Sequence, residues 1–432
     1  MMPLGLVLYR GLTYALSPFA PRWLGRRAKR GKEEASRLGE RFGFTDIPRP
    51  QGTLIWLHGA SVGEAAMALN LIKALRAARP EASFLLTTGT RTSAELVARQ
   101  GGKAVIHQYL PLDIPGAVQR FLTHWQPDLG LMLESELWPN LILDARARGV
   151  KLALVNARMN AHSLRRWQNV PFSAARLLNA FDWIGSADES TRMGLLRLTN
   201  KRHANIGNLK LSAPAPKADK TALKHLKDAF ADRPVWLGLS THEGEEKVLL
   251  AAHKSICEQH HNALLVLVPR HPERANNVAR LCIRMGLPPV RHSEGTILNK
   301  TMRVYLGDSI GDMGLWLRLG APAFIGGSLI STLTGHNPLE AAQINVPILC
   351  GPYRDSFFEL YDQLVKAKAA VQAQTAPAIA KTVLDLWQSP ERIQTMGAAG
   401  AGVAKSAAHI PMEETLSGLL PLIEKGQDDA RA

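Results

Sequence analysis

The sequence has few cysteines and lacks common cofactor fingerprints, and these absences narrow what the protein can be. Three cysteines occur in 432 residues, and Cys257, Cys282 and Cys350 lack the spacing of a metal or redox motif. Isolated cysteines of this kind indicate reduced intracellular thiols and argue against a secreted disulfide protein. No GxGxxG turn follows the first expected strand of either half, which argues against a nicotinamide cofactor. No Walker lysine motif appears either.

Acidic residues are scarce relative to basic ones. The chain has 37 Asp and Glu against 52 Lys and Arg, so its formal net charge is +15 and its pI is about 9.9. An excess of this size indicates an anionic partner: nucleic acid, acidic lipid headgroups or a phosphorylated substrate. Nucleic acid is the least favoured of these. The basic residues concentrate beside an apolar terminus and not among exposed aromatic residues.

The N-terminal segment is apolar but too interrupted for a clear membrane span. Residues 1–20 contain Arg10, Pro18 and two glycines, whereas a span needs about 20 uninterrupted apolar residues. A signal peptide is disfavoured because its charge would precede the apolar part. Here the basic cluster follows it, which suits anchoring on anionic lipid, either in the interface or barely spanning the bilayer. The alternative is a docked terminal helix with a solvated basic face. The cluster consists of Arg22, Arg26, Arg27, Lys29, Arg30, Lys32, Arg37 and Arg41.

Beyond residue 50, short apolar runs alternate with segments of helical period. Continuous apolar runs predict strands buried on both faces, and hence α/β domains with parallel sheets covered by helices. We therefore expect two doubly wound, Rossmann-like domains facing an interdomain cleft. Their expected limits are an N-terminal segment at 1–45, a first domain at 46–210, a linker at 211–220 and a second domain at 221–432. The expected strands cover residues 53–59, 83–89, 104–110, 129–135, 151–157, 183–187, 235–240, 263–270, 303–308, 323–328 and 346–351.

A glycine-rich segment in the second half, GGSLISTLTGHNPLE (326–340), predicts a nucleotide pocket. Paired glycines allow backbone N–H groups to approach a phosphate. Pro338 fits the first position of a helix that Asn337 would cap. Glu340 then lies in the first turn, where it can accept hydrogen bonds from a ribose. The competing interpretation is an ordinary strand-to-helix connection.

Two other expected strand ends in the second half carry suitable side chains. VPRHPER (268–274) contributes Arg270, the best candidate for a phosphate clamp. LGDSIGDMG (306–314) supplies glycines and a helix start that suit a base or phosphate. No DxD-like acidic pair stands at these strand ends, so we expect no metal and no cofactor.

Polar clusters also follow the strands of the first half. LHGASVGE (57–64) places Glu64 in the first turn of a helix, where the helix dipole favours its ionised form. The alternative role for Glu64 is that of a simple N-terminal charge. LESELWPN (133–140) carries Glu134 and Glu136, of which we expect only one to face the cleft. Lys210 stands just before the linker.

The chain resembles the bacterial 3-deoxy-D-manno-octulosonic acid (Kdo) transferases over most of its length. The resemblance rests on an ordered set of segments that is specific as a set: LHGASVGE, LESELWPN, NARMN, GNLKLS, STHEGEE, VPRHPER and GHNPLEAA. It implies a GT-B architecture and inverting transfer of Kdo from CMP-Kdo to the lipid A precursor lipid IVA, at the cytoplasmic face of the inner membrane. The expected partners are therefore CMP-Kdo, an anionic lipid acceptor and inner-membrane lipids, without nucleic acid.

The resemblance also implies roles for particular residues. Glu64 matches the proton acceptor, and Glu134 and Lys210 match stabilisers of the transition state. Some positions depart from the family pattern: Ile310 and Asp312 stand where Met and Glu are common. The residues that match CMP-contacting positions are Pro269, Arg270, Ile310, Gly311, Asp312, Asn337, Pro338, Leu339 and Glu340.

Two other functions are consistent with the same features. One is a different GT-B enzyme that uses a UDP-sugar and a lipid-linked acceptor, which competition by CMP against UDP would distinguish. The other is a non-catalytic protein that binds an acidic glycolipid, which product formation from CMP-Kdo would exclude.

Overall fold

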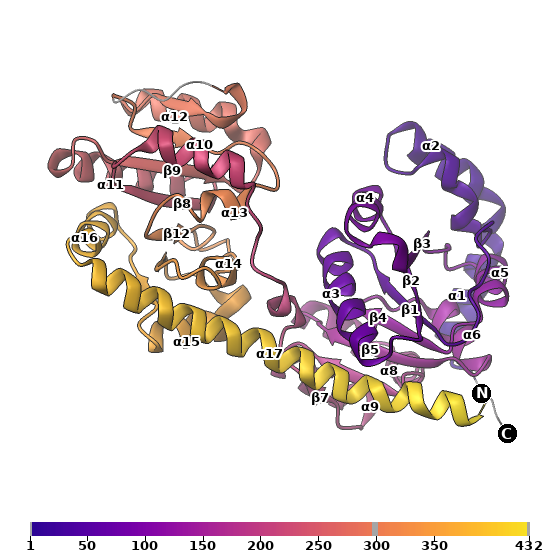
Figure 1. The fold of residues 1–432 in the computed structure, drawn as a ribbon. Helices are drawn as coiled ribbons and strands as arrows, with labels where there is room; N and C mark the ends of the chain where they lie inside the picture. The colour runs from indigo at the N-terminus through magenta and orange to yellow at the C-terminus, as the bar shows by residue number, and fades with distance from the viewer. Residues whose placement is uncertain (1, 296–300, 430–432) are drawn as a thin grey trace. The chain divides into compact units, whose positions relative to one another are not determined.

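The chain forms two compact units in a computed structural model (Figure 1). The first unit contains residues 1–213 and 408–432, and the second contains residues 214–407. The structure describes residues 2–295 and 301–429. Residue 1 of the expected N-terminal segment, and residues 296–300 and 430–432 of the expected second domain, lie outside the described residues.

The first unit is built on a seven-stranded parallel sheet in the order β3-β2-β1-β4-β5-β6-β7. The chain starts at β1 in the centre, moves out to β3 and then crosses to β4, so the carboxyl ends of β1 and β4 are neighbours at the switch point. The strands are β1 (Leu54–Gly59), β2 (Ser83–Thr88), β3 (Val105–Tyr109), β4 (Leu129–Leu133), β5 (Lys151–Ala157), β6 (Trp183–Ser186) and β7 (Ala204–Asn205).

Helices cover both faces of this sheet. Alternate residues of β1 belong to opposite clusters: Leu54 and Trp56 pack on one side, Ile55 and Leu57 on the other. This alternation is the period of two expected for a strand between two helical layers. The α-helices and 3-10 helices are α1 (Leu4–Leu16), η1 (Ser17–Phe19), α2 (Ala20–Lys29), η2 (Ala35–Phe42), α3 (Val62–Ala78), α4 (Arg91–Gln100), η3 (Gly102–Ala104), α5 (Pro115–Trp125), α6 (Pro139–Ala147), α7 (Ala161–Gln168), α8 (Pro171–Leu178), α9 (Glu189–Thr199) and η4 (Leu209–Ser212).

The second unit repeats this plan with a different strand order, β10-β11-β9-β8-β12-β13-β14, and its sheet is also parallel. Buried residues of α11, α12 and α16 pack with Trp236, Leu265 and Leu267 of the sheet. The strands are β8 (Val235–Thr241), β9 (Leu264–Pro269), β10 (Pro289–Arg291), β11 (Val304–Leu306), β12 (Ala323–Ile325), β13 (Ile348–Cys350) and β14 (Ala370–Gln372). The helices are α10 (Lys220–Phe230), α11 (Glu245–Gln259), η5 (Pro272–Arg274), α12 (Ala275–Arg284), η6 (His292–Glu294), α13 (Met313–Trp316), α14 (Leu339–Ala342), η7 (Asp355–Phe357), α15 (Phe358–Lys366), α16 (Ala376–Trp387) and α17 (Pro390–Asp429).

The expected parallel α/β fold is confirmed, and each of the eleven expected strands coincides with one in the structure within a few residues. Three strands were not expected from the sequence: β7, β10 and β14, which are two or three residues long. β11, β12 and β13 are as short but wholly apolar or aromatic, whereas the three missed strands end in the polar residues Asn205, Arg291 and Gln372 and so lack a continuous apolar run.

The last helix differs from the expected assignment of residues 221–432 to the second domain. Residues from Ala408 onward group with the first unit. The reason is local packing, because Leu419 and Ile423 of α17 are buried in the cluster that α3 forms with the first sheet. The division between the units falls at Ala213 and Pro214, inside the segment expected to be the linker.

The N-terminal segment consists of two helices, α1 and α2, joined by the turn η1. Three side chains of α1 bond to the body of the unit: Tyr9 donates to Asp113, Arg10 pairs with Asp144, and Thr13 accepts from Asn140. Within residues 2–295 and 301–429, no helix combines the length and apolar character needed to cross a membrane.

Candidate active site

Three predicted side chains of the first unit gather at the carboxyl edge of its sheet. Glu64 follows β1, Glu134 follows β4, and Lys210 lies in η4. A Cβ added to Gly63 would lie 3.9 Å from Cε of Lys210, so the lysine side chain reaches the first turn of α3, which carries Glu64. Strand topology therefore brings together residues that are far apart in the sequence.

Glu64 closes a capping box at the start of α3. Its Oε1 accepts a hydrogen bond from the Ser61 hydroxyl at 2.7 Å, and its Oε2 accepts one from the Ala60 N–H at 2.8 Å. The Ser61 hydroxyl oxygen accepts in turn from the Glu64 N–H. Gly59 allows this approach, because a Cβ there would lie 2.9 Å from that of Glu64. A carboxylate has about four acceptor positions, so Glu64 is fixed in place and still able to accept a proton.

Glu134 and Lys210 form an ion pair beside the capping box. Lys210 Nζ lies 2.5 Å from Glu134 Oε1, and the Asn156 amide lies 3.4 Å from the same oxygen. Asn156 also accepts from the Leu209 N–H at 2.7 Å, which ties η4 to the end of β5. Glu134 and Asn156 both have φ of 56°. Non-glycine residues with this backbone strain cluster at functional sites.

Glu136 binds a different partner from Glu134. Its carboxylate accepts from the Trp138 indole at 2.8 Å and lies 3.3 Å from Nε2 of the buried His58. Burial raises the pKa of Glu136. The hydrogen bonds from His58 and Trp138 and the charge of His58 act in the opposite direction and outweigh burial, so the pKa lies below its usual value. Strand alternation does not distinguish these two glutamates, because residues two apart share a strand face and because β4 ends at Leu133 and a turn follows.

In the second unit, the predicted nucleotide-binding residues follow neighbouring strands. Pro269 ends β9 and Arg270 comes next, Ile310 to Asp312 follow β11, and Asn337 to Glu340 follow β12. These strands lie together in the order β11-β9-β8-β12. Their carboxyl ends therefore share one edge of the sheet, which is where α/β folds bind ligands.

Arg270 is exposed and lies near Glu340. Among the residues that the structure describes, its guanidinium has no hydrogen-bond or ion-pair partner, so it is available to an anion. Glu340 is exposed at the surface. The protein around its carboxyl nevertheless raises its pKa, and the charge of Arg270 opposes this shift without cancelling it. An arginine beside a carboxylate is a suitable pair for a phosphate and a ribose diol.

The helix after Asn337 differs slightly from the expected one. It is the single turn α14, which begins at Leu339, so Pro338 occupies the cap position and not the first helical position. Asn337 still accepts from the Leu339 N–H at 3.0 Å. Helix ends are commonly displaced by one residue from sequence-based expectations.

The paired glycines do not offer free N–H groups to a phosphate, as the sequence suggested. The N–H groups of Gly327, Ser328 and Leu329 donate to the carboxylate of Glu245, at 2.7, 2.9 and 3.0 Å. The His242 N–H donates to it as well, at 3.0 Å. Glu245 is fully buried, and a protein carboxylate therefore occupies the anion position of this turn.

The same loop positions the predicted nucleotide contacts. Gly335 and His336 donate their N–H groups back to the carbonyls of Gly327 and Gly326, at 2.8 and 3.2 Å. Asn337 follows directly. Glu245 thus fixes one end of a closed loop whose other end carries Asn337 to Glu340.

Two histidines lie beside this loop. Nε2 of His242 is 2.7 Å from Nε2 of His336, and the rings are stacked. Burial, together with the charges of His242, Arg270 and His271, lowers the pKa of His336 to about 4. Burial also lowers the pKa of His242. Both rings are therefore neutral near pH 7, and one donates the hydrogen that the other accepts.

Sequence reasoning missed three residues that organise these sites: Asn156, Glu245 and the His58 partner of Glu136. Each belongs to a recognised segment, NARMN, STHEGEE or LHGASVGE, but its contacts depend on tertiary structure. Across residues 2–295 and 301–429, no cluster of three or more His, Cys, Asp or Glu side chains has the arrangement of a metal site.

Comparison with known proteins identifies the family. Residues 36–213 match the family model described as 3-deoxy-D-manno-octulosonic-acid transferase (kdotransferase). The chain is 33% identical to the 3-deoxy-D-manno-octulosonic acid transferase of Haemophilus influenzae, over 91% of this chain and 93% of that protein. It is also 33% identical to a probable mitochondrial transferase of the same name from Arabidopsis thaliana, over 92% of each.

Solved structures agree with this fold. A glycosyltransferase from Rickettsia africae has a TM-score of 0.59 at 10% identity and covers 87% of this chain and 99% of its own. The UDP-GlcNAc 2-epimerase of Neisseria meningitidis has a TM-score of 0.56 at 14% identity and covers 86% and 100%. These likenesses show a GT-B-like pair of parallel-sheet domains. The sequence identities above establish that the chain is a glycosyltransferase and belongs to the Kdo transferase family.

Proposed function

We propose that this enzyme transfers Kdo from CMP-Kdo to the lipid A precursor lipid IVA, with inversion at the anomeric carbon and without a metal. The observation that carries the proposal is the arrangement of Glu64 with the ion pair of Glu134 and Lys210. It supplies a fixed carboxylate and an adjacent cation, which are the groups needed for base-assisted displacement.

In the proposed reaction, Glu64 removes the proton from a glucosamine 6-hydroxyl of the acceptor. The resulting oxygen attacks the anomeric carbon of Kdo, and the bond from that carbon to the phosphate oxygen of CMP breaks on the opposite face. The bonding electrons leave with CMP. Lys210, held by Glu134, stabilises charge that develops in the transition state, and Arg270 binds the cytidylate phosphate.

Glu64 suits this role because its orientation is fixed before the substrate binds. The hydrogen bonds from Ser61 and Ala60 hold both oxygens, so little reorganisation is needed as the proton moves. Arg270 and Glu340 suit the donor because one can pair with the phosphate and the other can accept from the ribose hydroxyls. CMP-Kdo is the donor implied by the family.

We also propose that the enzyme works at the cytoplasmic face of the inner membrane. The exposed apolar side chains of α1, among them Leu4, Leu8 and Leu12, support contact with lipid. The first 32 residues contain seven basic residues and no acidic one, which favours an anionic surface. Asp113 bonds both to Tyr9 of α1 and to the N–H groups of Asn140 and Leu141, so α1 adjoins the helix that follows the Glu134 segment.

The test is product formation by the purified full chain. CMP-Kdo and a tetra-acylated lipid acceptor should give Kdo-modified acceptor and CMP, detected by mass spectrometry, and the yield should be unchanged by EDTA. CMP should compete with the donor and UDP should not. Competition by UDP alone would favour a UDP-sugar enzyme, and acceptor binding without any product would favour a non-catalytic glycolipid-binding protein.

A further inference from the structure

The turn between α7 and α8 exposes large apolar side chains that the proposed transfer reaction does not use. Phe172 is 81% exposed and Val170 is 46% exposed, at the start of α8. Trp167 lies at the end of α7 and lines a shallow hollow with Ser163, Arg166 and Val170. Single exposed apolar residues need no explanation, but a cluster on one turn indicates an interaction surface.

This turn lies beside the exposed apolar side chains of α1. A Cβ added to Gly5 would lie 2.8 Å from the hydroxyl of Ser173, the residue after Phe172. Gly5, Leu8 and Leu12 are three and four residues apart, so they share one row on the surface of α1. Leu8 and Leu12 are 63% and 59% exposed. The apolar surface of α1 therefore continues onto the turn between α7 and α8.

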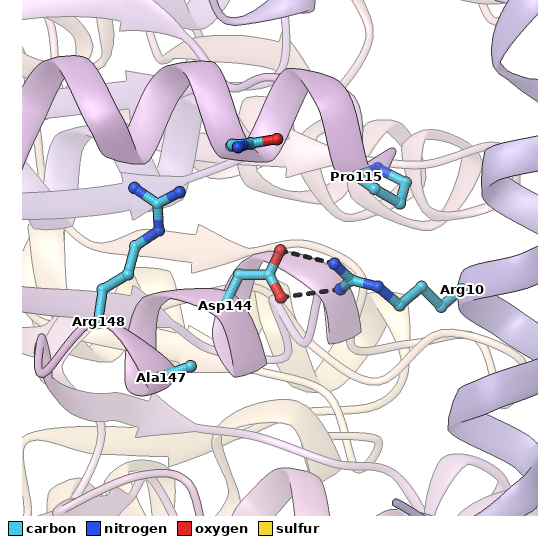
Figure 2. Close-up of a pocket in the computed structure, with 6 residues that line it drawn as sticks. Arg10, Pro115, Asp144, Ala147 and Arg148 are labelled. Carbon is cyan, nitrogen blue, oxygen red and sulfur yellow. Dashed lines mark hydrogen bonds and ion pairs between the residues drawn. The ribbon is translucent and has the colours of Figure 1, made fainter.

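α1 is firmly attached to the body of the unit, so both elements present this surface together. Figure 2 shows Arg10 of α1 reaching Asp144 of α6, with two hydrogen bonds of 2.8 and 3.2 Å. Tyr9 and Thr13 add bonds to Asp113 and Asn140. These contacts use the face of α1 that carries buried Leu6 and leave the face of Leu8 and Leu12 uncovered.

The two segments that carry this apolar surface have charges of a single sign. Residues 161–178, which contain α7 and α8, include three arginines and no acidic residue, and residues 1–32 contain no acidic residue. The arginines Arg165, Arg166 and Arg176 are exposed. Apolar side chains surrounded by basic ones, with a tryptophan at the edge, match the headgroup region of an anionic bilayer.

We propose that the turn between α7 and α8 is a second membrane contact, which inserts Val170 and Phe172 into the interface of an anionic bilayer beside α1. This inference rests on the proposed membrane localisation and adds a second point of attachment to it. Two separate contacts on one rigid unit fix its orientation on the bilayer, whereas α1 alone would allow rotation about its own axis. A fixed orientation presents the same edge of the unit to every lipid acceptor.

The test uses co-sedimentation of the full chain with vesicles, without donor or acceptor. The vesicles are phosphatidylethanolamine with phosphatidylglycerol, and phosphatidylcholine alone serves as the neutral comparison. The double variant V170S/F172S should bind anionic vesicles about tenfold more weakly than the natural chain. Phe358→Ser is the matched control, because Phe358 is 59% exposed on the second unit, and its binding should be unchanged.

A second variant tests the charge. Replacing Arg165, Arg166 and Arg176 by Gln should weaken binding to anionic vesicles about tenfold or more and leave the weak binding to phosphatidylcholine unchanged. Circular dichroism verifies that each variant is folded. Equal binding by V170S/F172S and the natural chain would overturn the proposal, as would a loss of self-association in that variant with vesicle binding intact. Binding is measured without Kdo transfer, so failure here leaves the proposed reaction to be judged by its own assay.

Discussion

The two units place a glutamate at the same topological position and use it differently. Glu64 follows β1 and Glu245 follows β8, and these are the first strands, in chain order, of their sheets. Each glutamate lies in the first turn of the helix that comes next. Glu64 is 8% exposed and accepts one hydrogen bond on each oxygen. Glu245 is fully buried and accepts four from backbone N–H groups. Glu64 retains acceptor capacity, and Glu245 has none left.

The neighbouring strand explains the difference. β4 pairs with β1 and is followed by Glu134, whose charge is directed to Lys210. β12 pairs with β8 and is followed by Gly326 and Gly327, whose turn directs N–H groups inward. A nest of N–H groups binds a nearby carboxylate. The carboxylate of Glu134 offers no donor to Glu64, whose hydrogen bonds come from Ala60 and Ser61. Position at the strand end thus makes a carboxylate available, and the neighbouring loop decides whether the carboxylate keeps acceptor capacity for the proposed reaction or accepts its full set of hydrogen bonds within the fold.

Replacing Glu64 should have the largest effect. Both Glu64→Ala and Glu64→Gln should lower turnover by about 1000-fold or more, because no group remains to accept the hydroxyl proton. Binding of CMP-Kdo, measured by isothermal titration calorimetry, should stay within about twofold of the natural value, since the predicted donor contacts belong to the second unit.

A control variant distinguishes the proposed role of Glu64 as a base from its role in capping the helix. Ser61→Ala removes the hydroxyl from the capping box but keeps the carboxylate, and should cost about 1 kcal/mol of stability with little loss of turnover. Near-normal turnover in Glu64→Ala would show that another group is the base.

Breaking the ion pair of Glu134 and Lys210 should have the next largest effect. Lys210→Met and Glu134→Gln should each reduce turnover about 100-fold, because the cation is either lost or no longer held in place. The double variant should be little worse than either single one, since residues that act as a pair are not additive. Steady-state kinetics of the four proteins measures this coupling. Glu136→Gln is the control, because its partners are His58 and Trp138, and fully additive losses would argue against a functional pair.

The fold and the first-unit site were largely predictable from the sequence. Apolar runs marked the strands, and Glu64 and Glu134 each follow one, so the parallel topology alone predicts a common edge for these two. Lys210 follows β7, which the sequence does not signal. The expectation that only one of Glu134 and Glu136 faces the cleft had no basis in strand geometry, because residues two apart share a face and because β4 ends at Leu133, two residues before the expected end. Whether these groups carry out the predicted roles is a separate question, which the variants above address.

The organisation of the glycine loop was not predictable in the same way. A glycine pair after a strand indicates an anion-binding turn, but it does not identify the anion. Glu245 is separated from Gly327 by 82 positions in sequence, and only the pairing of β8 with β12 brings them together. Asn156 illustrates the same limit, since its bond to Leu209 joins residues 53 positions apart.

Replacing Glu245 tests its structural role, for comparison with the proposed catalytic role of Glu64. Glu245→Gln puts an amide N–H₂ among backbone donors, which should loosen the loop and weaken CMP binding about tenfold, with turnover at saturating donor nearly unchanged. Glu246→Gln is a matched control. Glu246 is equally buried on the same helix, but its carboxylate binds Arg274 and Thr241 and not the glycine loop. Calorimetric titration of both variants with CMP gives the comparison, and equal weakening in both would mean that any buried charge loss has this effect.

The smallest expected effect concerns the tryptophan that each first strand buries. Trp56 donates to the Thr87 hydroxyl, whereas Trp236 donates to Nδ1 of His253. Burial lowers the pKa of His253 to about 4; its bond to the Arg303 carbonyl opposes this shift, and the nearby charges of Arg303 and Arg233 reinforce it.

Because the pKa of His253 is depressed in the folded state, the unfolded chain binds a proton first as the pH falls below its ordinary value of 6.5. Its contribution to stability is therefore complete above pH 6.5 and is lost progressively toward pH 4. From about pH 7.5 to 5.5, the second unit should lose about 1 kcal/mol through this residue. Hydrogen exchange of the β8 amides measures the loss, and His253→Gln should remove that part of the pH dependence although it lowers stability at every pH. An unchanged pH dependence in the variant would exclude His253 as its source. In the first unit no such pH dependence is expected, because the corresponding tryptophan, Trp56, donates to Thr87, which does not titrate in this range.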